Sequence, residues 1–177
     1  MISVLVLSLL AAPSAALKLQ PPTVKTTGNS YVLILSPQLE SAAAKYVDDH
    51  PGIRLATFTD TREGDEVRKM MAAGEIQFPY ALWKDLNRDG LLDVVLVFIS
   101  KKVVNQWAWH DWFIVAFHGT SAATFVPVAI TKTQGSCLDS LVPHKADDWV
   151  EFSCFGVAAG AFRWNGKTYE VKAMMGD

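Results

Sequence analysis

A run of six consecutive apolar residues, 94–99 (VVLVFI), constrains the fold of this chain more than any other feature. In a β-strand, successive side chains point to opposite faces, so a strand with one face in solvent alternates apolar and polar residues. Here both alternate sets are apolar, which is typical of a central strand that is covered on both faces. The sequence therefore predicts a layered domain built around a sheet.

Helical patterns precede strand patterns along the chain. One predicted helix starts at Ser36-Pro37 and ends before residue 51, and a second covers residues 62–73, with acidic side chains early and basic ones later. Asn165-Gly166 is a typical two-residue hairpin turn. This order predicts an α+β domain, with two N-terminal helices packed on a mostly antiparallel β-sheet. The predicted strands are residues 31–35, 53–58, 80–83, 93–99, 107–117, 125–130, 149–155, 161–164 and 167–173.

The first sixteen residues differ from the rest of the chain because they carry no charge and include a long apolar run. The run ends in small residues, with Ser14 and Ala16 at the positions that signal peptidase requires. We expect a signal peptide over residues 1–16, and hence a secreted or periplasmic protein; the alternative is a buried N-terminal strand or helix. Residues 17–29 then form a linker or extended arm, and residues 30–177 form a single globular domain.

Charge and hydropathy narrow the classes of partner. The net charge is −2, and the sequence has no run of Lys or Arg. A nucleic-acid backbone or an anionic membrane surface would need such a basic patch, so neither is an expected partner. The N-terminal apolar run is shorter than the roughly 20 residues of a membrane-spanning helix, and we expect no transmembrane span.

An acidic loop follows the predicted strand 80–83 and leads into the central strand. Its spacing places oxygen-bearing side chains at alternate positions, with a glycine that permits a tight turn. Calcium prefers six to eight oxygen ligands, which this pattern supplies together with one main-chain carbonyl and water. The flanking strands, and Leu96 at the twelfth position, argue against an EF-hand. The expected ligands of a structural Ca²⁺ ion are Asp85, Asn87, Asp89, the Leu91 carbonyl and Asp93.

The loop resembles the strand–loop–strand calcium loops of FG-GAP and VCBS-type repeats, the kind found in integrin α-chain propellers and in exported bacterial proteins. The resemblance covers about residues 84–98. It implies a calcium loop and export. A propeller would need several such repeats, whereas this chain has one, so the resemblance implies neither a propeller nor an adhesion role.

Two cysteines, Cys137 and Cys154, form an even pair, which in an exported protein predicts a disulfide. The alternatives are two free thiols or one catalytic cysteine. Cys137 or Ser140 with His144 would supply the residue types of a hydrolase, although closeness in sequence does not provide the geometry.

The tryptophans Trp107, Trp109 and Trp112 either fill the core or a sheet surface, or form a platform for a ligand. The leading functional hypothesis is an exported non-catalytic domain with a structural calcium site that binds a protein or glycan partner. Two alternatives remain: an envelope hydrolase using Cys137 or Ser140 with His144, and a structural accessory subunit with an exposed apolar patch.

Overall fold

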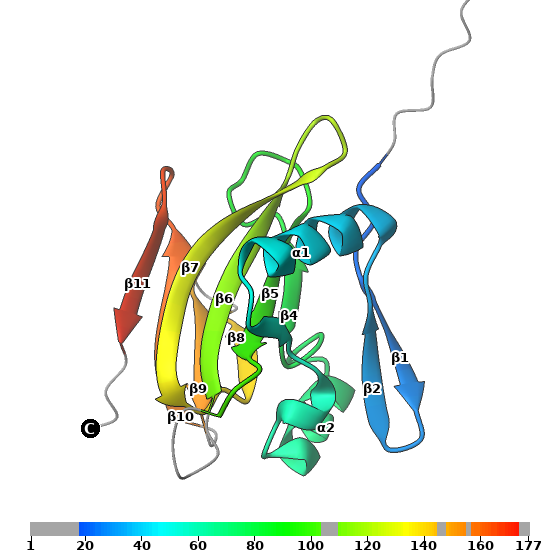
Figure 1. The fold of residues 1–177 in the computed structure, drawn as a ribbon, viewed down its shortest axis with the longest axis vertical. Helices are drawn as coiled ribbons and strands as arrows, with labels where there is room; N and C mark the ends of the chain where they lie inside the picture. The colour runs from blue at the N-terminus through cyan, green and yellow to red at the C-terminus, as the bar shows by residue number, and fades with distance from the viewer. Residues whose placement is uncertain (1–17, 104–109, 145–147, 155–156, 174–177) are drawn as a thin grey trace, which may run out of the picture.

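The apolar run 94–99 lies in strand β5 (Asp93–Ser100), at the centre of the molecule (Figure 1). All six of its side chains have 0% exposure, which confirms the prediction of a strand covered on both faces. The computed structural model describes residues 18–103, 110–144, 148–154 and 157–173.

The central sheet is antiparallel throughout. One side of β5 pairs with β6 (His110–Gly119), which pairs in turn with β7 (Phe125–Ser136). Two short strands share the other side: β4 (Ala81–Lys84) pairs with the beginning of β5, and β3 (Ile53–Leu55) with its end. The acidic loop therefore connects two paired strands of this sheet.

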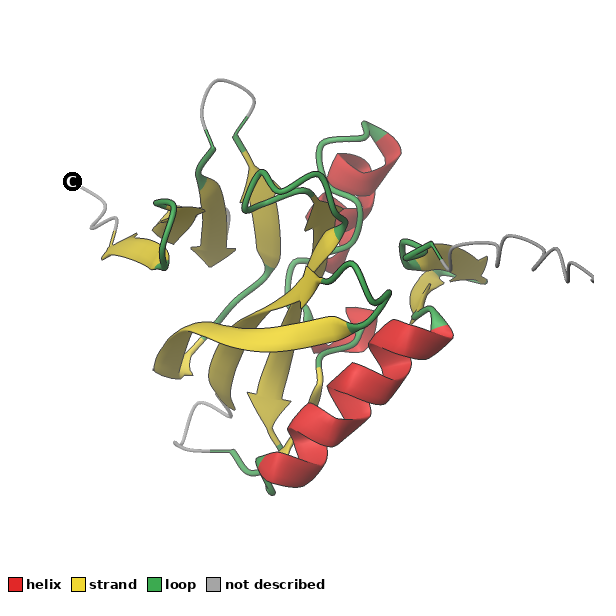
Figure 2. Cartoon of the chain, turned by 90° about the horizontal axis from the view of Figure 1, so that it is seen from above, coloured by secondary structure: helices red, strands yellow, loops and turns green. Residues whose placement is uncertain are grey.

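Helix α1 (Pro37–Asp49) covers one face of the central sheet (Figure 2). Its Pro37 occupies the first turn, as predicted. The ring of Tyr46 lies 5.1 Å from the ring of Phe98 on β5 and 6.0 Å from that of Phe117 on β6. These contacts close the core on this side.

A second, four-stranded sheet covers the opposite face. Its strands are β8 (Ser140–Pro143), β9 (Val150–Cys154), β10 (Val157–Trp164) and β11 (Tyr169–Ala173), in the order β11-β10-β9-β8. The two sheets are joined near β4 and β8, where the Leu141 amide donates to the Pro79 carbonyl at 2.9 Å. The predicted Asn165-Gly166 turn connects β10 and β11, which pair as a hairpin.

The remaining elements lie beside these layers. A separate hairpin consists of β1 (Thr23–Thr27) and β2 (Ser30–Ile34), and Figure 1 shows it projecting next to α1. A short 3₁₀ helix, η1 (Phe58–Asp60), precedes α2 (Gly64–Ala72).

The predicted α+β fold class is wrong. Strands make up 47% of the structure and helices 18%, and the strands form three sheets. Only α1 packs across the central sheet, and the other face of β5 is covered by a second sheet in place of a second helix. Periodicity identifies a strand that is covered on both faces, but it does not say which kind of element covers each face. Strands β1 and β8 are not among the predicted strands, and β7 and β10 are longer than predicted, which together add to the sheet content.

An ion pair fixes the turn between β3 and α2. Arg54 donates two hydrogen bonds to the Asp60 carboxylate, at 2.7 and 2.6 Å, and the amide of Thr57 donates to the same carboxylate at 2.8 Å. Burial alone would raise the pKa of Asp60, but the bonds from Arg54 and Thr57 lower it below the usual 3.8. The charged form of Asp60 is therefore the one that stabilises the fold.

We expect Asp60→Asn to lower the free energy of unfolding at pH 7 by about 1 kcal/mol, a modest value because Arg54 is partly solvated. Since the folded pKa is depressed, this contribution is present above the unfolded pKa of about 3.9 and disappears as the pH falls through the folded pKa. Urea unfolding of both proteins from neutral pH down to about pH 2.5 measures the difference. A stability difference between the two proteins that stays constant with pH would contradict a stabilising role of the charged Asp60 carboxylate.

Candidate functional site

The acidic loop is wound around its own side-chain oxygens. Asp85 accepts hydrogen bonds from the amides of Asp89, at 3.2 Å, and Gly90, at 2.9 Å. Asn87 accepts from the Asp89 amide at 3.1 Å, and Asp89 accepts from the Leu91 amide at 2.8 Å. The backbone takes a positive φ of 83° at Gly90, which glycine adopts without strain. Asp85 and Asp89 are exposed at the surface of the loop.

Asp93, the last predicted ligand, has a different environment. It has 0% exposure, and one of its oxygens accepts from the amides of Leu86, at 2.8 Å, and Asn87, at 3.2 Å. The other oxygen accepts from the Gly119 amide at 3.0 Å and lies 3.1 Å from Nδ1 of His118. Burial alone would raise the pKa of Asp93, but the bonds from His118, Leu86 and Gly119 lower it below 3.8. Asp93 thus anchors the loop to β6.

The predicted calcium ligands therefore fall into two groups. Asp85 and Asp89 are exposed, whereas Asn87 is half-buried and its side-chain nitrogen lies 3.2 Å from Nδ1 of His118; all three residue types suit a hard cation. Asp93 already accepts four bonds, so it would have to exchange some of them to bind an ion. Within the described parts of the chain, one group brings three potential His, Cys, Asp or Glu ligand atoms within 4.8 Å of one another, and it consists of Cys137, Asp139 and Cys154. It includes no residue of the acidic loop.

Cys137 and Cys154 form a disulfide, with their Cα atoms 5.5 Å apart. Their sulfurs are therefore not available as a nucleophile or as thiolate ligands. The Ser140 hydroxyl is paired with that of Ser153 at 2.7 Å. His144 instead lies 2.6 Å from a carboxylate oxygen of Glu151.

The hydrogen bonds around β8 and β9 therefore do not pair either proposed nucleophile with His144. In addition, the side chain of Ser140 is only 2% exposed. The expected hydrolase arrangement is not assembled among the described residues.

The expected aromatic platform is described only in part, since Trp107 and Trp109 lie outside the described residues. Trp112 is 4% exposed and stacks on Tyr80 with 5.3 Å between ring centroids, so it belongs to the core. His110 contacts the Ser100 carbonyl at 2.7 Å.

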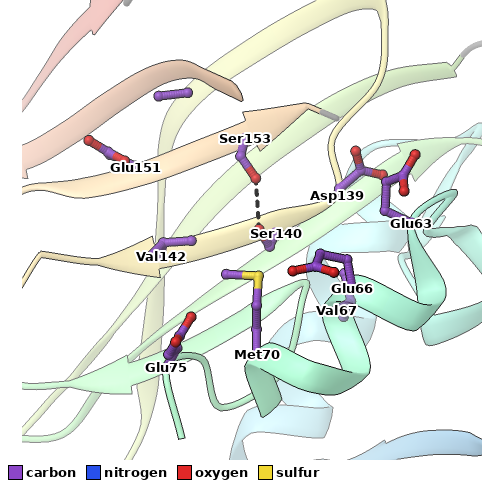
Figure 3. Close-up of a pocket in the computed structure, with 11 residues that line it drawn as sticks. Glu63, Glu66, Val67, Met70, Glu75, Asp139, Ser140, Val142, Glu151 and Ser153 are labelled. Atoms are coloured by element: carbon purple, nitrogen blue, oxygen red, sulfur yellow. Dashed lines mark hydrogen bonds between the residues drawn. The ribbon is translucent and has the colours of Figure 1, made fainter. Parts of the chain in front are cut away.

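A pocket that sequence patterns did not reveal lies between α2 and the β8–β9 side of the second sheet (Figure 3). Its volume is about 350 Å³. We call it the α2 pocket, and its lining residues are Glu63, Glu66, Val67, Met70, Glu75, Asp139, Ser140, Val142, Glu151, Ser153 and Ala158.

Local periodicity explains how these side chains meet. Residues 63, 66, 67 and 70 have the spacing of one helix face, which α2 turns towards the sheet. Residues 140 and 142 of β8, and 151 and 153 of β9, are alternate strand positions that share a face. The sequence predicts the helix, but it does not predict the strand opposite it, because β8 has only four residues and begins with a polar serine.

Most of the polar side chains that line the α2 pocket are acidic, and three of the five carboxylates have partners outside the lining. Five of its lining residues are Asp or Glu, and none is Lys, Arg or His. Glu63 and Glu75 have no ion pair or side-chain hydrogen bond to any residue that the structure describes. Glu66 is paired with Lys69 at 3.0 Å, and Asp139 accepts from the Arg62 amide at 3.3 Å.

A second pocket, of about 450 Å³, lies between the acidic loop and the β10–β11 turn. Arg88 of the loop forms an ion pair with Asp148 at this pocket. Trp164 contributes an aromatic side chain from the end of β10. We call it the loop pocket, and its lining residues are Leu86, Asn87, Arg88, Asp148, Arg163, Trp164, Asn165 and Gly166.

A scan against protein-family models and searches of curated proteins and of solved structures find no match to this chain. No helix in the described segments is long and apolar enough to cross a membrane. The function has to be inferred from the residues and their geometry.

Proposed function

We propose that this chain is an exported, non-catalytic binding domain whose 85–93 loop is stabilised by a calcium ion. The observation that carries the proposal is the winding of the loop around Asp85, Asn87 and Asp89, which gathers oxygen-bearing side chains on an exposed turn. These three side chains and the Leu91 carbonyl would hold the ion. Asp93 would contribute mainly by fixing the loop to the sheet.

The export part of the proposal is supported by the composition of residues 1–16 and by the disulfide, because disulfides persist in oxidising compartments. Residues 1–16 lie outside the described structure. The non-catalytic part is supported by the pairing of Ser140 with Ser153 and by the loss of Cys137 as a thiol.

The loop pocket gives the proposed calcium ion a role in binding. Leu86, Asn87 and Arg88 form one wall of this pocket, so an ion that orders the loop also orders the wall. Trp164 and the polar side chains around it are of the kinds that contact sugars and protein surfaces. A protein or glycan partner at this position would bind more tightly when calcium is present.

Calcium is expected to raise the thermal stability of the mature domain, because an ion that binds only the folded state stabilises it. At a free concentration of 100 times the dissociation constant, the gain is about 2.7 kcal/mol. The measurement is the melting temperature in EDTA and across calcium concentrations up to about 10 mM, since extracellular calcium modules often bind at about 0.1–1 mM.

Asp89→Ala should abolish this response. The matched control is Asp48→Ala, which removes the same charge from an exposed position on α1. A melting temperature that does not respond to calcium in the wild type, or a response that survives Asp89→Ala, would overturn the calcium part of the proposal.

A further inference from the structure

We infer that Cys137, Cys154 and Asp139 form a zinc site when the disulfide is reduced, with two thiolates and one carboxylate as its ligands. The ligand atoms of these three residues lie within 4.8 Å of one another. In the oxidised protein the two sulfurs are bonded to each other, so the cross-link and the zinc ion exclude one another. The site is separate from the acidic loop and does not depend on the proposed calcium ion.

The geometry of this group fits a tetrahedral ion. Zinc lies about 2.3 Å from a sulfur ligand and about 2.0–2.2 Å from an oxygen ligand, which separates the ligand atoms by roughly 3.5–3.8 Å. The Cα atoms of Cys137 and Cys154 are 5.5 Å apart, so side-chain rotation after reduction can bring the sulfurs to this separation. A water molecule would take the fourth position, as in zinc sites with three protein ligands.

Main-chain contacts hold the three ligands together without help from the cross-link. The Asp139 amide donates to the Ser153 carbonyl at 2.8 Å, which places Asp139 beside the second cysteine. The Tyr80 hydroxyl donates to the Leu138 carbonyl at 3.0 Å, which fixes the residue between the first cysteine and Asp139. Neither hydrogen bond involves a sulfur. We therefore expect the three side chains to stay near one another in the reduced protein.

The environment of Asp139 is typical of a metal-binding carboxylate. Asp139 is 3% exposed, and its Oδ1 accepts from the Arg62 amide at 3.3 Å. A carboxylate has lone pairs enough to bind an ion and accept hydrogen bonds together, and metal-binding carboxylates are usually oriented by such donors. Asp139 also lines the α2 pocket, which gives an ion a path from solvent to the site (Figure 3).

The ligand types select the metal. Thiolates favour zinc and softer ions, whereas calcium and magnesium prefer sites made of oxygen alone. Zinc also accepts a carboxylate beside thiolates in its tetrahedral shell. The acidic loop offers only oxygen ligands, so the two proposed sites differ in the metal that they prefer.

A dithiol reductant opens the site. Its thiolate attacks one cysteine sulfur, the S–S bond breaks, and a second attack within the mixed disulfide releases the reductant as its own disulfide. The protein gains two electrons and two protons, which leaves Cys137 and Cys154 as thiols. Zinc binding then releases two protons, because the thiols bind the ion as thiolates.

The test is a zinc titration of the oxidised protein and of the protein reduced with a dithiol, which is removed under nitrogen before zinc is added. We expect the reduced protein to bind one zinc ion with a dissociation constant of about 1 μM or tighter, measured by competition with a chromogenic chelator. The oxidised protein should bind zinc at least about a hundredfold more weakly. Calcium at about 10 mM is present throughout, to compete with zinc for the acidic loop. Cobalt in place of zinc should give a thiolate-to-metal absorption band.

Two variants assign the ligands. Cys137→Ser/Cys154→Ser should lose the zinc site, and Asp139→Asn should weaken zinc binding by the reduced protein about tenfold or more. Asparagine keeps an oxygen acceptor for the Arg62 amide. The matched control is Asp48→Asn, which makes the same change at an exposed position on α1 and should leave the affinity unchanged. Circular dichroism checks that each protein is folded.

Each outcome decides the matter. Absence of zinc binding by the reduced protein, or equal affinity of the oxidised and reduced proteins, would overturn the inference. Wild-type affinity in folded Asp139→Asn would remove Asp139 from the site and overturn it too. If reduction or Asp139→Asn unfolds the chain, zinc should restore the folded spectrum of the reduced wild type, because an ion that binds only the folded state stabilises it; failure to do so counts against the site. The calcium experiments use oxidised protein, so the two sites are tested separately.

Discussion

Replacing Asp93 with alanine is expected to lower the free energy of unfolding by about 3–5 kcal/mol, because several buried donors lose their shared acceptor and each such loss costs about 1–3 kcal/mol. The substitution leaves the amides of Leu86, Asn87 and Gly119 without an acceptor, and it leaves His118 without its carboxylate. Each buried donor that loses its partner is itself destabilising. Urea unfolding followed by tryptophan fluorescence measures the loss, and EDTA is present so that calcium does not contribute.

Asp89→Ala is the matched control, because Asp89 has the same side chain in the same loop but lies at the surface. Its carboxylate accepts hydrogen bonds from the Leu91 amide and from the side-chain amide of Asn87, both near the surface, and we expect a cost below about 1 kcal/mol. The loss of unfolding free energy for Asp93→Asn should lie between the losses for Asp93→Ala and Asp89→Ala. Asparagine keeps the size of the side chain and one acceptor oxygen, but its NH₂ group would point a donor at backbone N–H groups. Equal losses for Asp93→Ala and Asp89→Ala would show that Asp93 is not an anchor.

Asp93 illustrates what a sequence motif can and cannot predict. The spacing of the loop identified Asp93 as an oxygen-bearing residue aimed at the loop interior, and its oxygens do contact the loop amides. Two further contacts come from His118 and Gly119, which lie on β6 and are brought to the loop only by pairing of β5 with β6. The burial of the Asp93 carboxylate and its full set of hydrogen-bond donors therefore depend on tertiary structure, which the loop motif alone does not predict.

The same distinction holds for the fold. The double-sided apolar pattern of residues 94–99 and the proline-initiated α1 are local signals, and both predictions are confirmed. The number of sheets is not a local property, because it depends on what covers the second face of β5. Strand β8 is absent from the predicted strands, although Leu141 is 1% exposed and the neighbouring Ser140 is buried with its hydroxyl paired to that of Ser153. A paired hydroxyl can occupy a buried strand position, so polarity alone misled the prediction there.

The α2 pocket was missed for a related reason. In the sequence, the helix dipole is a sufficient reason for the acidic residues in the first turn of α2. Nothing in the sequence places Glu151 of β9 or Asp139 opposite that turn. Concentration of negative charge in one cavity results from the packing of α2 against the second sheet, and it is visible only in the structure.

Removing the disulfide is expected to lower the free energy of unfolding by about 3 kcal/mol. Cys137 and Cys154 are separated by 17 positions, and a cross-link that closes a loop of this length restricts the unfolded chain by about that amount. The variant Cys137→Ser/Cys154→Ser keeps side chains of similar size, so the loss of the cross-link dominates the effect. Urea unfolding of the variant and of the oxidised wild type gives the difference.

Two controls separate the cross-link from packing. Reduced wild type should unfold like the serine variant, and reductant should not change the variant. Because the chain-entropy effect acts on the unfolded state, and because Ser140 and Ser153 are register partners in the β8–β9 ladder, the folded variant should retain the circular dichroism spectrum of the wild type. A variant as stable as the oxidised wild type would contradict the stabilising role of the disulfide.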